Sequence, residues 1–126
     1  MKSKNSSLLP VLLVIQTLSI IIYTLIAFNN EGFTLFQIFF SNIISLTWNG
    51  QFNLDFSFYL LLSGIWVVWR NNFSPLSYVL ALITFVMGIA IFAPYLVYLY
   101  ITENGNIIRI IVGNNADFNN IKEIKG

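Results

Sequence analysis

The sequence contains no cysteine and no histidine, and it is poor in charge. Its 126 residues include 6 Lys and Arg and 5 Asp and Glu, so that 9% of the chain is charged, against about 25% in an ordinary soluble domain. The absence of cysteine excludes disulfides, thiolate nucleophiles and Cys-based metal sites. The absence of histidine removes the commonest general base and metal ligand. We therefore expect no metal, no cofactor and no catalytic residues, and we predict that the protein is not an enzyme.

The few charged residues also argue against one class of partner. The net charge is +1 and the basic residues are spread along the chain, whereas nucleic-acid-binding proteins gather Lys and Arg into a patch or stripe. Apolar residues, by contrast, make up 57% of the sequence. A soluble fold of this size could not bury so much apolar surface, so we expect the lipid bilayer as partner and the cell membrane as location.

Three apolar runs are predicted to be transmembrane helices: residues 8–28, 54–69 and 76–101. A bilayer core about 30 Å thick needs roughly 20 helical residues, which the first and third runs supply and the second does not. The first run exceeds the length of a signal-peptide core, and no cleavage pattern of small residues follows it. We expect it to remain as a membrane anchor.

The connection between the first two runs is unusually apolar. Residues 33–48 carry no charge, and Thr34, Gln37, Ser41 and Ser45 recur in them at helical spacing. This pattern predicts an amphipathic helix that lies on the outer membrane face or dips into it as a re-entrant segment. A fourth transmembrane helix is the alternative, and it would move the C-terminus to the other side.

The predicted fold class is therefore all-α. We expect one helical membrane domain over residues 1–113, with three transmembrane helices and one outer amphipathic or re-entrant helix, or with four transmembrane helices. Residues 114–126 are polar and are expected to form a C-terminal tail.

Positive charge predicts the orientation, because Lys and Arg accumulate in short cytoplasmic loops. With three spans and a cytoplasmic N-terminus, Lys2, Lys4 and Arg70 lie inside. The connection 29–53 contains no Lys or Arg and lies outside. In this arrangement Arg109 falls on the outer side.

An acidic residue, Asp55, stands at the head of the second apolar run. If Asn53 caps that helix, the carboxylate lies in the first turn, where the helix dipole favours it. The functional alternative groups Asp55 and Tyr59 with Tyr95 and Tyr98 in an outer-leaflet pocket for a lipidic or small ligand. The tyrosines could equally form an interfacial aromatic belt.

The third run has one face of small residues. They recur at intervals of four, three and four: Ser77, Ala81, Thr84 and Gly88. Small side chains let membrane helices approach closely enough to pack. The neighbour is either the second span, through Gly64, or another protein chain.

Several short motifs between residues 53 and 113 have a recognisable order. They are Asn53-Leu-Asp-Phe, Gly64-Ile-Trp-Val-Val-Trp-Arg70, Phe73-Ser-Pro75, Gly88 and Pro94-Tyr-Leu96. In these motifs the chain resembles small uncharacterised bacterial membrane proteins of the domain-of-unknown-function family 2834. The resemblance implies a bacterial multispan protein of about this size, and it implies no reaction.

Two functions follow as hypotheses from these features. The first is a non-enzymatic accessory or structural subunit that packs against other membrane protein subunits, or against itself, through the small-residue face and residues 33–48. The second is a binder or carrier of a lipidic or small ligand in the pocket around Asp55.

Overall fold

The structure is a computed structural model that describes residues 8–115. All regular elements in this range are helical, which confirms the all-α prediction. In chain order they are α1 (Leu8–Glu31), α2 (Leu35–Ile44), α3 (Trp48–Arg70), α4 (Pro75–Met87), α5 (Ile89–Thr102), α6 (Ile107–Val112) and the short 3₁₀ helix η2 (Gly113–Asn115). The predicted tail begins inside η2, and its remainder, 116–126, lies outside the described residues.

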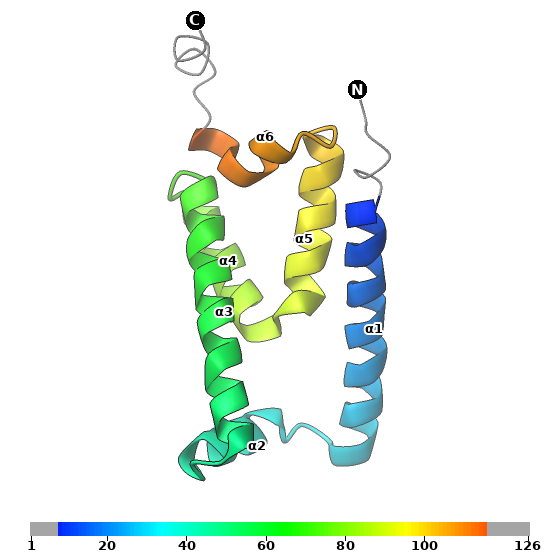
Figure 1. The fold of residues 1–126 in the computed structure, drawn as a ribbon, viewed down its shortest axis with the longest axis vertical. Coiled ribbons are helices and arrows are strands. Elements are labelled where there is room, and N and C mark those ends of the chain that lie inside the picture. Colours follow the sequence, from blue (N-terminus) through cyan, green and yellow to red (C-terminus); the bar gives the residue numbers. More distant parts are fainter. Residues whose placement is uncertain (1–7, 116–126) are drawn as a thin grey trace, which may run out of the picture.

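Two helices are long and apolar enough to cross a membrane, α1 with 24 residues and α3 with 23. They stand on opposite sides of the molecule with α5 between them, and α2 lies across the end where α1 finishes and α3 starts (Figure 1). The helix predicted over residues 33–48 is thus present in a shorter form. Asn106, at the opposite end, accepts a hydrogen bond from the Arg109 N–H and caps α6, which lies over that end.

Helix α3 begins six residues before the predicted Leu54, because the polar cluster at its start is held by α2. Gly50 is buried against the backbone of Asn42, and the Asn53 side chain donates to the carbonyl oxygen of Phe39 at 3.3 Å. Contacts with α2 therefore keep this segment helical, although its composition predicts a helix break. Asn53 is not a cap, and the first-turn explanation for Asp55 is wrong.

The predicted single helix over residues 76–101 is also wrong, because the chain breaks at Gly88. Its backbone angles, φ 65° and ψ −137°, belong to a region that only glycine enters easily. The Gly88 N–H donates to the Thr84 carbonyl, and its own carbonyl accepts from Phe92. Helix α4 runs inward from the Arg70 end and α5 returns to that end (Figure 1). The two form a hairpin about 20 Å deep at 1.5 Å per residue.

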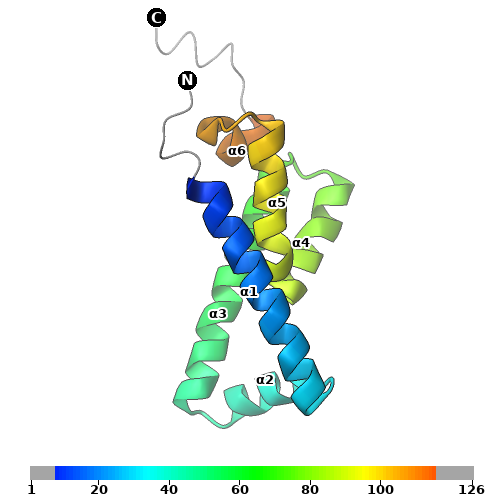
Figure 2. The same ribbon diagram turned by 90° about the vertical axis from the view of Figure 1, so that its right-hand side faces the viewer.

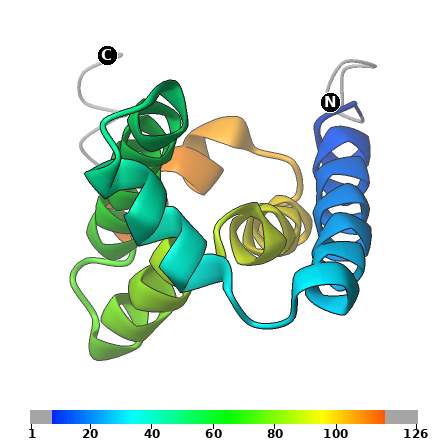
Figure 3. The ribbon, with the colours of Figure 1, turned by 90° about the horizontal axis from the view of Figure 1, so that it is seen from below.

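The hairpin joins α3 to α1. Helix α4 packs on α3 and α5 packs on α1, as the end-on and side views show (Figures 2 and 3). The small-residue face of α4 turns towards α3: a Cβ at Gly64 would lie 3.5 Å from the Ala81 carbonyl oxygen, and Ser77 and Thr84 are buried. Of the two partners considered for this face, the structure shows the one within the chain.

Candidate functional site

The structure does not bring together the four residues of the predicted pocket. Asp55 and Tyr59 are exposed on the half of α3 that faces α2. Tyr95 and Tyr98 lie towards the other end, where the Tyr95 hydroxyl accepts a hydrogen bond from Asn71 Nδ2 at 2.9 Å. Asp55 precedes Asn71 by 16 residues, or about 24 Å of helix. The cause is the reversal at Gly88, since an unbroken helix would have carried the tyrosines towards Asp55.

Polar side chains gather instead at the end of α3, around Arg70. This side chain is 5% exposed although Arg is seldom buried without partners. Its Nε donates to the Ile110 carbonyl oxygen at 2.5 Å, and Nη2 lies 3.4 Å from the Arg109 carbonyl oxygen. A third nitrogen, Nη1, lies 3.4 Å from Asn71 Oδ1. The guanidinium therefore ties α3 to the backbone of α6.

One carboxylate forms ion pairs with two arginines at this end. Glu103 follows the last residue of α5, and its Oε1 lies 3.6 Å from Arg70 Nη2. Its Oε2 lies 3.0 Å from Nε of Arg109, whose side chain is 52% exposed. Two cations and one anion leave the group with a net charge of +1.

Further contacts fix the segment from α6 to η2 on α3. Trp66 Nε1 donates to the Ile111 carbonyl oxygen at 3.1 Å, and Asn115 Nδ2 donates to that of Trp69 at 2.6 Å. Gly113, with φ +57°, passes so close to Arg70 that a Cβ there would lie 2.5 Å from Cγ of the arginine. No side chain larger than hydrogen fits at this crossing.

A cavity of about 450 Å³ opens between α4 and α5 beside this cluster. Its polar lining comes from Arg70, Asn71, Ser74, Ser77, Tyr95, Thr102 and Glu103, and its apolar lining from Leu76, Leu80, Tyr98 and Leu99. The hairpin creates this space, because it places the first turns of α4 opposite the last turns of α5. Sequence reasoning missed the cavity, because it placed Arg70 in a cytoplasmic loop and the tyrosines on the opposite side.

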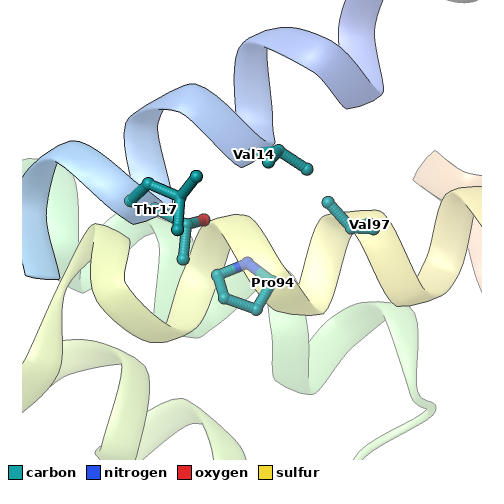
Figure 4. A pocket seen from close by; sticks show the side chains of 5 residues that line it. Val14, Thr17, Pro94 and Val97 are labelled. Atoms are coloured by element: carbon teal, nitrogen blue, oxygen red, sulfur yellow. The ribbon is translucent and has the colours of Figure 1, made fainter.

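A smaller cavity of about 190 Å³ lies between α1 and α5 (Figure 4). It is lined by Val14, Thr17, Leu18, Pro94 and Val97. Pro94 has no N–H for the carbonyl four residues earlier, and the Thr17 hydroxyl already donates to the Leu13 carbonyl at 2.8 Å. The site therefore has few free hydrogen-bonding groups, and it is a packing defect at a proline rather than a polar binding site.

Neither cavity has the residues of a metal centre: within 8–115, no group of three Asp, Glu, His or Cys side chains could hold an ion. Comparison with family models, curated proteins and solved structures finds no match. Function must therefore be argued from the geometry of the chain itself.

Proposed function

We propose that this chain is a non-enzymatic integral protein of the cell membrane that acts as an accessory or structural subunit of a membrane complex. In the proposed arrangement α1 and α3 cross the bilayer, and the α4–α5 hairpin enters and leaves on one side. Residues 75–102 contain no charged side chain, which suits insertion into hydrocarbon. This arrangement replaces the expected third crossing.

The distribution of charge supports two crossings. Arg70, Arg109 and the start of α1 lie at one end of the molecule (Figure 1), and Lys2 and Lys4 precede α1 in the sequence. The connection 32–47 at the other end contains no Lys or Arg. The positive-inside rule then places the Arg70 end in the cytoplasm, and Arg109 no longer contradicts it.

Single cysteines can test this topology cleanly, because the natural chain contains none. Asn72→Cys, Asn114→Cys and Ser45→Cys would each be labelled in intact cells with a membrane-impermeant maleimide. If the chain crosses the membrane twice, the reagent should label Ser45→Cys and should not label Asn72→Cys or Asn114→Cys. Labelling of Asn114→Cys with protection of Asn72→Cys would establish three crossings instead.

The observation that carries the subunit proposal is the uncovered hairpin tip. Met87, beside the break, is 55% exposed, and Phe85 is 40% exposed. Gly88 itself is buried against α3, so the uncovered part of the tip consists of apolar side chains, which suit packing against another helix in the membrane. Helix α1 packs on α5, and among the described residues Leu13 is the only one of α1 that is buried, so most of its apolar surface is also uncovered. A neighbouring subunit would complete the shielding.

Native mass spectrometry of the protein, extracted gently from its own membrane, tests this proposal. We expect additional polypeptides, or further copies of this chain, at a fixed stoichiometry. Met87→Trp should release them by obstructing the tip, whereas Val79→Trp, at a position 54% exposed on the same helix, should not. A lone chain in both the wild type and the variants would refute the subunit function.

A ligand carrier remains the second candidate, but without the pocket around Asp55. The observation that favours it is the cavity beside Arg70.

A further inference from the structure

We propose that the cavity between α4 and α5 binds a phosphate group, supplied by the headgroup of a phospholipid. The inference rests on the proposed membrane location, and not on the subunit role. It is carried by the hydrogen-bonding capacity that the cavity leaves unused.

The unused groups are donors. Ser74 Oγ accepts from the Ser77 N–H at 3.4 Å, and the Tyr95 hydroxyl accepts from Asn71. In the part of the chain that the structure describes, neither hydroxyl proton is given to a protein acceptor. A guanidinium has five N–H donors, and the Nη1 group of Arg70 has a single long contact, to Asn71. Three side chains therefore line the cavity with hydrogen atoms to donate.

The carboxylate and amide oxygens, by contrast, are engaged. Both oxygens of Glu103 face arginines, and Asn71 Oδ1 faces Arg70. The Ser77 and Thr102 hydroxyls have already given their protons, to the carbonyls of Ser74 at 2.5 Å and of Leu99 at 3.2 Å, so they offer no donor and keep only acceptor lone pairs. A cavity with three side chains able to donate, beside a cluster of net charge +1, is suited to a negative group that accepts hydrogen bonds. A phosphodiester has these properties.

Position and shape favour a lipid as the source. The cavity lies at the end of α3, where a span finishing at Arg70 would reach the headgroup layer. Leu76, 77% exposed, lies beside the polar lining, and Leu80 lies one turn further along α4; the two offer an apolar path for an acyl chain. A volume of about 450 Å³ falls among small-ligand sites, which span about 300–1,000 Å³, and can hold a phosphate with its glycerol.

The test is a lipid titration of the purified full chain followed by native mass spectrometry. The probes are dimyristoyl phosphatidylglycerol, dimyristoylglycerol, which has the same chains without phosphate, and inorganic phosphate. We expect the phospholipid adduct to form and the diacylglycerol adduct to be at least tenfold weaker. Equal binding of the two lipids would overturn the proposal. Inorganic phosphate that binds and displaces the lipid would support the phosphate site and identify a soluble anion as a competing source.

Tyr95→Phe removes one donor while it keeps the ring, and should weaken phospholipid binding about five- to tenfold, as expected for one hydrogen bond. Tyr78→Phe on α4, 55% exposed and outside the cavity, is the matched control and should bind as the wild type does. Equal affinities for Tyr95→Phe and Tyr78→Phe would refute the assignment of the donors.

The two proposals can fail separately. If the chain binds phosphatidylglycerol but never co-purifies with another subunit, the subunit role is refuted and the phosphate site is supported. If the chain has partners at a fixed stoichiometry but no preference for the phospholipid over the diacylglycerol, the subunit role is supported and the phosphate site is refuted.

Discussion

Nε of Arg70 lies 2.5 Å from the carbonyl oxygen of Ile110, 40 residues further along the chain. The carbonyls of Ile110 and Arg109 belong to the last turn of α6, where carbonyls lack partners within the helix; that of Arg109 also accepts from the N–H of Gly113. A buried cation at that point satisfies them and also complements the helix dipole. Arg70 is therefore one of the side chains that dock α6 on α3, together with Trp66.

Gly113→Ala should detach α6. A Cβ would lie 2.6 Å from the Arg70 carbonyl oxygen, and φ is +57°. We expect a loss of about 2–4 kcal/mol in the free energy of unfolding, from the left-handed backbone and the steric clash together. Thermal denaturation in detergent would measure the loss, and faster tryptic cleavage after Arg109 would report the release of α6.

Gly32→Ala is the control for that experiment. Gly32 has φ +69°, and no atom lies within 4 Å of the position that a Cβ would take, so this variant carries the backbone penalty without the clash. We expect a loss of only about 1–2 kcal/mol and unchanged cleavage after Arg109. Equal losses in the free energy of unfolding for Gly113→Ala and Gly32→Ala would show that the steric clash with Arg70 contributes nothing to the destabilisation.

Glu103→Gln should destabilise the protein more than Arg109→Gln does. Removing the carboxylate leaves Arg70, 5% exposed, without its anion, and hydrogen bonds to buried charges contribute about 1.5–3 kcal/mol. Removing Arg109, which is 52% exposed, breaks a surface pair that is typically within about 1 kcal/mol. Melting temperatures of the two variants should differ in this order, and the reverse order would contradict the role given to Arg70.

Thr84→Val should stabilise the protein slightly. Thr84 is 0% exposed, and among the described residues its hydroxyl has no hydrogen-bond partner. Replacing an unsatisfied buried hydroxyl by a methyl group of similar size removes a desolvation cost of about 1 kcal/mol or more. Thr17→Val, where the hydroxyl donates to Leu13, should give no gain. Loss of stability in Thr84→Val would mean that the hydroxyl has a partner in the membrane.

Gly88→Ala should shift the hairpin towards one continuous helix. Alanine disfavours φ +65° by about 1–2 kcal/mol and is the best helix former, by about 1 kcal/mol over glycine. In the single-cysteine assay, Asn114→Cys combined with Gly88→Ala should become labelled from outside in part of the molecules. Complete protection would show that packing on α3 alone holds the hairpin.

The helical class and the core of each long helix could be predicted from sequence, because apolar length reports them directly. The hairpin could not. A glycine within an apolar run is compatible with close helix packing and with a chain reversal, and Gly88 has both features: it lies next to Leu60 and Phe56 of α3 and it has a positive φ. Hydropathy does not distinguish between the two.

The candidate site was missed for the same reason. The partners of Tyr95 depend on which end of α3 this residue lies beside. Because the chain reverses at Gly88, Tyr95 lies beside the C-terminal end of α3 and not beside its start. Arg70 appeared to be an ordinary cytoplasmic loop charge, and its burial depends on Glu103 and α6, which return to it only through the hairpin.

The packing of α1 on α5 sets the order in which the chain can mature. Helix α1 has its main neighbour in α5, which ends at Thr102, so the two can pair only after α2, α3 and α4 have been synthesised. Helices α3 and α4 are close in sequence and can pair early, since short-range contacts form with little loop-closure entropy. Closure of α1 against α5 therefore comes late in assembly, and we expect substitutions at Val14 or Val97 to slow maturation more than those between α3 and α4.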